Sequence, residues 1–98
     1  MITKAYELIA DPKNWRKGGY AYNTKGWSCW WNDPEAVCFC AGGAIRRCYD
    51  GVEFKEKSQL LRDEVVKLGF ETVAKWNDAE ATTHEEVITT LKKVEDGS

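Results

Sequence analysis

The sequence predicts a mainly α-helical fold: a single small domain of about four helices around a central Gly/Cys/Ala-rich helix, with one short β-hairpin. Three observations predict it. Apolar residues recur every three or four positions in several stretches, a Gly- and aromatic-rich segment alternates as a hairpin does, and 98 residues suffice for one core. Within the domain, 1–98, the predicted elements are a helix over 1–11, a hairpin over 18–31, the central helix over 34–49, and helices over 53–69 and 83–95.

The central helix is the stretch against which the other elements are expected to pack. Its apolar stripe, at spacings of three and four, consists of Val37, Cys40, Ala41, Ala44, Ile45 and Cys48. Gly42 and Gly43 interrupt it, at about 1 kcal/mol each relative to alanine in an exposed helix interior. That cost is acceptable where another backbone or a large ring comes close, and the chain supplies five Trp, four Tyr and three Phe. We therefore expect aromatic side chains to lie over a helix narrowed by two glycines.

The elements before the central helix are predicted from stop and turn residues. Asp11 and Pro12 end the first helix, because proline cannot continue it. Residues 23–26 form the turn of the hairpin, with a final glycine available for positive φ. Asp33 as N-cap and Pro34 as first helical residue then suit the start of the central helix.

The elements after the central helix follow from apolar stripes and caps. The stripe of the helix over 53–69 consists of Phe54, Leu61, Val65 and Leu68. Gly69 ends that helix, and residues 70–76 favour a further short helix. Thr83 and Glu86 form a capping box at the start of the last helix. The buried face of that helix is predicted to hold Val87, Ile88, Leu91 and Val94.

Composition and charge exclude several classes of protein. The formal net charge is -2, with 14 basic and 16 acidic residues interspersed. Because no basic stripe is available to neutralise phosphates, nucleic-acid binding is not expected. The N-terminus is too polar for a signal peptide and no run reaches transmembrane length. We therefore expect a cytoplasmic protein without membrane contact.

The cysteines are predicted to be buried small thiols rather than disulfides or metal ligands. They are Cys29, Cys38, Cys40 and Cys48. In the cytoplasm they stay reduced. They contain no CxxC pair, and the single histidine, His84, lies far along the chain. No metal and no cofactor is expected.

The order and spacing of several short motifs resemble a family of small bacterial and phage proteins known only as domain of unknown function 6197. The first motif is Trp-x-x-Gly followed by the alanine of a hairpin: Trp15, Gly18 and Ala21. The second is a Cys-x-x-Gly-Ala-aliphatic helix with an arginine two residues on: Cys40, Gly43, Ala44, Ile45 and Arg47. The last two are Trp-Asn-Asp and Thr-x-x-Glu-Val: Trp76, Asn77, Asp78, Thr83, Glu86 and Val87.

The resemblance spans nearly the whole chain and supports the fold without implying an activity. Gly42, before the glycine of the motif, and Cys48, where alanine is expected, depart from the pattern. The glycine at position 42 narrows the central helix further. The association with phage and bacterial proteins suggests an accessory role, such as modulation of a host or defence component.

Two constellations have both a chemical and a structural interpretation. Asp78 beside Asn77 suits a base or metal ligand, but Asn and Asp also hydrogen-bond loop backbones before a helix, and the structural interpretation is favoured. Cys40 with His84 suits a nucleophile and its base. Because Cys40 is predicted on the apolar side of a helix, burial would raise its thiol pKa and disfavour that role.

Two further groups bear on binding. Of Arg46 and Arg47, we expect Arg47 to bind a carboxylate or carbonyl inside the domain. The aromatic residues of the hairpin region either cover the central helix or form a contact surface, and they are Tyr20, Tyr22, Trp27, Trp30 and Trp31. Both interpretations stay open at this stage.

The sequence favours a small interaction or accessory module that binds a protein partner, or a second copy of itself, through the aromatic hairpin. An enzyme is the less favoured class. The alternative from that class is a small enzyme or metal-binding domain that uses Asp78, Cys40 or His84.

Overall fold

The computed structural model describes residues 4–97. Helices dominate these residues, as predicted, but there are five α-helices and a three-stranded sheet instead of about four helices and one hairpin. The elements are α1 (Ala5–Leu8), the 3₁₀ turn η1 (Pro12–Asn14), β1 (Ala21–Asn23), β2 (Ser28–Cys29), β3 (Ala36–Phe39), α2 (Ala41–Cys48), α3 (Gly51–Lys67), α4 (Val73–Asp78) and α5 (His84–Glu95).

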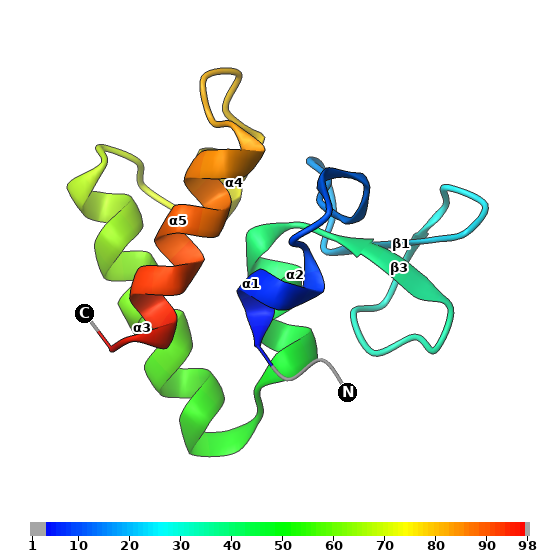
Figure 1. Cartoon of the computed structure of the whole chain (residues 1–98), viewed down its shortest axis with the longest axis horizontal. Helices are drawn as coiled ribbons and strands as arrows, with labels where there is room; N and C mark the ends of the chain where they lie inside the picture. Colours follow the sequence, from blue (N-terminus) through cyan, green and yellow to red (C-terminus); the bar gives the residue numbers. More distant parts are fainter. Residues whose placement is uncertain (1–3, 98) are drawn as a thin grey trace.

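Helix α2 is the central element. It packs against α1, α3, α4 and β3, and Figure 1 shows it between the sheet on the right and α3 on the left. Its buried residues are small, apart from one isoleucine: Ala41, Gly43, Ala44 and Ile45. The predicted central Gly/Ala-rich helix is therefore present, with its small side chains facing the core.

The glycine pair lies where another part of the chain comes close. A β-carbon at Gly43 would stand 2.9 Å from the carbonyl carbon of Tyr20 and closer still to the carbonyl oxygen. At Gly42 it would lie 3.5 Å from the ring of Tyr20, an ordinary van der Waals distance. As expected, a backbone segment and an aromatic ring come close to the glycines. Both belong to Tyr20. The most exposed indoles, Trp27 and Trp30, do not cover the helix.

The predicted start of the central helix at residue 34 is wrong. Residues Ala36–Phe39 form strand β3, and α2 begins at Ala41 with Cys40 as its N-cap. Asp33 caps a turn instead, accepting a hydrogen bond from the amide of Glu35 (2.8 Å). β1 supplies the backbone partners of β3, so the segment needs no helix to satisfy its hydrogen bonds.

The sheet has the order β2–β1–β3, with both pairs antiparallel. The predicted hairpin is present, but its strands span 21–29 rather than 18–31: Ala21 pairs with Cys29, and Gly26 adopts φ +80° in its turn. In β3 a register shift leaves Val37 out of the pairing with β1. This bulge breaks the alternation of buried and exposed residues by which a strand is recognised in sequence.

The first helix is shorter than the predicted 1–11. Helix α1 ends at Leu8, and residues 1–3 lie outside the described part of the chain. Asp11 has an extended backbone, as the residue before proline prefers, and accepts a hydrogen bond from the amide of Lys13 (2.9 Å). The Asp-Pro pair therefore begins a separate 3₁₀ turn.

Helix α3 ends at Lys67, slightly earlier than predicted, in a glycine-containing cap. Gly69 has φ +94°, and its amide donates to the carbonyl of Val66. The amide of Phe70 donates to the carbonyl of Val65. This is a Schellman motif. Leu61 and Val65 of the predicted stripe are buried. The prediction that Leu68 belongs to this stripe is wrong, because the cap leaves its side chain 56% exposed.

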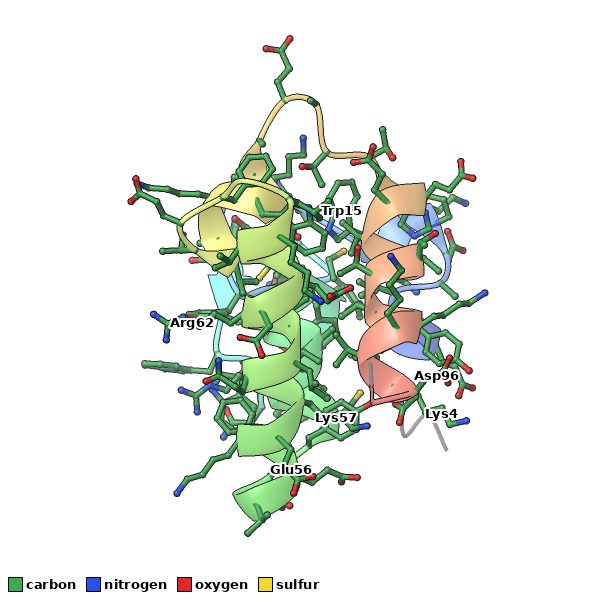
Figure 2. All side chains as sticks on the ribbon, turned by 90° about the vertical axis from the view of Figure 1, so that its left-hand side faces the viewer. Lys4, Trp15, Glu56, Lys57, Arg62 and Asp96 are labelled. Carbon is green, nitrogen blue, oxygen red and sulfur yellow. The ribbon has the colours of Figure 1, made fainter. Side chains whose placement is uncertain are left out.

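Helix α5 begins with the predicted capping box of Thr83 and Glu86, and Val87, Leu91 and Val94 are buried. Ile88 packs at the edge of the core. Figure 2 shows Lys57 of α3 beside the end of α5, where its ammonium group donates to Glu95 (3.2 Å). The two helices are thus joined by apolar packing and by this ion pair.

Candidate functional site

The Trp-Asn-Asp motif forms a buried hydrogen-bond centre. Asn77 is fully buried at the end of α4, and its side-chain oxygen accepts from the indole of Trp15 (2.7 Å) and from the amide of Ala41 (3.0 Å). Its side-chain nitrogen donates to the carbonyl of Arg16 (3.2 Å) and to Asp78 (3.1 Å). The amide uses both donors and both acceptor positions, and thereby joins α4, the start of α2 and the segment before the sheet.

Asp78 extends the same centre to the surface. Its carboxylate accepts from the amide of Gly18 (2.9 Å), which adopts φ +104°, and it is itself exposed. The ammonium group of Lys17 donates to the carbonyl of Ala79 (2.6 Å). These bonds tie the Trp-x-x-Gly motif to the Trp-Asn-Asp motif. They support the structural interpretation of Asn77 and Asp78, and Trp76 beside them is buried in the core.

Arg47 binds carbonyl groups inside the domain, as predicted. Its guanidinium donates to the carbonyls of Trp31 (2.9 Å) and Asp33 (2.8 Å). Because both carbonyls belong to the loop between β2 and β3, Arg47 of α2 fixes the loop that carries Trp31.

Cys40 and His84 are engaged with different partners. The sulfur of Cys40 accepts a hydrogen bond from the amide of Gly43 (3.2 Å), and the ring of His84 lies 2.7 Å from the carbonyl of Ile9. Burial raises the pKa of Cys40 although the amides of Gly43 and Gly42 act to lower it. Cys40 was predicted mid-helix and is instead the N-cap, yet the expected raised pKa is found.

We predict that Cys40 and Cys48 react slowly with a thiol reagent at neutral pH. Burial raises the pKa of Cys48 to about 11 and also that of Cys40, so both remain protonated at pH 7. Cys38 and Cys29 are half-buried, and although burial also raises the pKa of Cys29, both should be modified before the buried Cys40. Mass spectrometry of peptides after timed alkylation measures the order, and full labelling in denaturant is the control. Modification of Cys40 as fast as a free thiol in native buffer would contradict the prediction.

The aromatic residues of the hairpin region divide into two groups. Tyr20, Trp27 and Trp30 are 59%, 65% and 77% exposed, whereas Trp31 is half-buried. Tyr22 is half-buried and lies elsewhere, with the guanidinium of Arg16 4.1 Å from its ring centre. Tyr22 therefore belongs to the support of the sheet, and the other four rings are candidates for a contact surface.

These four rings line a shallow hollow of about 540 Å³ over the β2 side of the sheet, which we call the aromatic hollow. Its wall also includes Ser28 and Asp33. Trp31 is fixed there through Arg47, and Tyr20 through its carbonyl, which accepts from the amide of Cys40 (3.3 Å). The exposed rings thus rest on elements that are anchored to α2.

A second depression, missed in the sequence, adjoins Tyr20 on the side of α2. We call it the Arg46 groove; it has a volume of about 200 Å³, and its wall includes Tyr20, Gly42, Ile45, Arg46, Phe54 and Val73. The sequence predicts an internal partner for Arg47 and assigns no separate role to Arg46. The glycine at position 42 was the one available signal, since it leaves room beside the ring of Tyr20.

A larger hollow, of about 590 Å³, lies between the end of α3, α4 and α5. Its rim includes Thr83 and Glu86, whose side chains already form the capping box of α5. Across residues 4–97, no three His, Cys, Asp or Glu side chains gather closely enough to hold a metal ion. The helices described here include none with the length and apolar character needed to cross a membrane.

Fold and site together define a small α-helical domain with a minor sheet, in which the motif residues form the central hydrogen bonds. The model of a family of unknown function (DUF6197) matches residues 1–96, and the chain belongs to that family. The resemblance seen in the sequence is confirmed. Searches of curated proteins and of solved structures find no match.

Proposed function

We propose that this protein is a small interaction module that binds a protein partner through the aromatic hollow. The observation that supports the proposal most is the exposure of Tyr20, Trp27 and Trp30 on one surface. Exposed clusters of large aromatic side chains are typical of binding sites, where Trp and Tyr carry much of the binding energy. A role as an accessory or modulator module is consistent with a domain this small.

The exposed area is sufficient for the centre of an interface but not for a whole one. At about 200 Å² for each large ring, three rings exposed by more than half offer roughly 400 Å². One partner of a standard interface contributes about 800 Å². The partner must therefore also contact groups beside the rings.

Substitution of Trp27 and Trp30 by serine is expected to abolish binding without unfolding the protein. Both indoles contact mainly solvent, so the free energy of unfolding should fall by no more than about 1 kcal/mol. Binding is measured by affinity capture from the source cells and by sedimentation equilibrium, which detects a dimer. Circular dichroism confirms that the helices persist.

Val66→Ser is the matched control, because Val66 is 56% exposed on α3 and lies outside the aromatic hollow. It should leave binding unchanged. Unfolding of the Trp27→Ser, Trp30→Ser variant would show that the indoles belong to the core. A parent chain that captures nothing and stays monomeric would equally overturn the proposal.

A further inference from the structure

Arg46 lies between the aromatic hollow and the Arg46 groove. It forms part of the wall of the groove, and its guanidinium stands 5.7 Å from the ring centre of Trp31, which lines the aromatic hollow. Tyr20 borders both depressions. The two depressions are thus neighbours, with a cation and an aromatic ring at their common edge.

The charge of Arg46 is held in place but not neutralised. Its guanidinium lies 4.7 Å from the ring centre of Phe54, so it stacks on an aromatic face. Within residues 4–97 it forms no ion pair and no hydrogen bond, and its side chain is exposed. A stacked guanidinium keeps its N–H donors at the edge of its plane, where they match a carboxylate. The guanidinium of Arg47, by contrast, already uses its donors on two backbone carbonyls.

The groove beside Arg46 is apolar. Ile45, Leu61 and Val73 contribute to its wall, and the missing side chain at Gly42 opens it next to the ring of Tyr20. A volume of about 200 Å³ suits one large side chain rather than a folded element. An apolar side chain placed there would bring its own neighbours in the peptide within reach of Arg46.

We propose that the partner presents a peptide segment in which an aspartate or glutamate adjoins a large apolar residue. The apolar side chain fills the Arg46 groove, the carboxylate pairs with Arg46, and the segment continues past Tyr20 over the aromatic hollow. This inference rests on the proposed function and specifies its partner. Charge complementarity favours the acid at Arg46 rather than further along, because Asp33 is part of the wall of the aromatic hollow.

Selection of short random peptides displayed on phage against the immobilised full chain tests this partner chemistry. Enriched peptides should carry Asp or Glu next to a large apolar residue. A synthetic peptide of the enriched sequence should bind about tenfold more weakly to Arg46→Gln, since a charge-assisted pair is lost. When the Arg46→Glu variant is the immobilised target, the enriched peptides should carry a basic residue in place of the acidic one. Lys92→Glu is the control, because it makes the same charge change on α5, outside both depressions.

The outcomes separate this inference from the proposed function. Enriched peptides that need Trp30 but show no acidic preference, or keep it with Arg46→Glu, would overturn the role of Arg46 and leave the aromatic surface intact. Peptides that need Arg46 but bind the Trp27→Ser, Trp30→Ser variant equally well would support the acidic segment and overturn the aromatic surface. No enrichment over an uncoated support would overturn the acidic segment, whereas the aromatic surface is tested separately by affinity capture and sedimentation. Circular dichroism of each variant confirms its fold.

Discussion

Gly43→Ala is expected to destabilise the protein by about 3 kcal/mol or more, the upper range for overpacking a core. The added methyl group would overlap the Tyr20 carbonyl oxygen, which accepts a hydrogen bond from the amide of Cys40. Since the obstacle is main chain, no rotation of a side chain relieves it. Chemical denaturation followed by circular dichroism measures the loss.

Gly42→Ala is the matched control, with the same substitution one residue away. Its methyl group would meet the Tyr20 ring at 3.5 Å and a methyl group of Val73 at 3.8 Å. We expect the free energy of unfolding to change by less than about 1 kcal/mol, because alanine also favours the helix. Equal effects at the two positions would contradict the packing of Tyr20 on α2.

Asn77→Ala is expected to lower the free energy of unfolding by about 3 kcal/mol. The substitution leaves the indole N–H of Trp15, the amide of Ala41 and the carbonyl of Arg16 without their partner, at about 1–3 kcal/mol for a buried polar group. Three elements lose their common contact at once. Thermal and chemical denaturation measure the effect.

Two variants control this result. Asn32→Ala removes an exposed asparagine and should change stability by less than about 0.5 kcal/mol. Asn77→Asp retains the acceptor for Trp15 but places a second carboxylate against Asp78. Repulsion raises the pKa of the new carboxyl group, so its ionised form destabilises the fold and stability relative to the parent should improve as the pH falls. An Asn77→Asp variant that is as stable as the parent at pH 7 would contradict the buried hydrogen-bond centre around Asn77.

The sequence predicted the helices best where stripe and cap agreed. The capping box at Thr83 and the glycine stop at Gly69 are local signals, and both appear as expected. Strand β3 was missed because Ala36–Phe39 is short, apolar and bulged, and a short apolar run has no decisive period. Its partner, β1, lies far enough along the chain that no local pattern reveals the pairing.

The candidate site was predicted only in its residue types. Aromatic residues near a hairpin suggested a surface, but their exposure depends on tertiary packing, which separates Tyr22 from Trp27 and Trp30. Arg47 is predicted as the arginine that binds carbonyls, but the stacking of its neighbour Arg46 on Phe54 depends on tertiary packing that the sequence does not reveal. One step of about 100° around the helix decides which arginine binds backbone carbonyls and which stays exposed.

The most direct test of the account is a nuclear Overhauser spectrum of the parent protein in solution. The Tyr20 main chain lies against Gly43, which fixes the segment that leads into the aromatic hollow. We therefore expect a strong cross-peak between the α-protons of Gly43 and Tyr20, and ring-current shifts at Gly42 from the Tyr20 ring. Glycine α-protons with the shifts of an uncovered helix and no cross-peak to Tyr20 would contradict it.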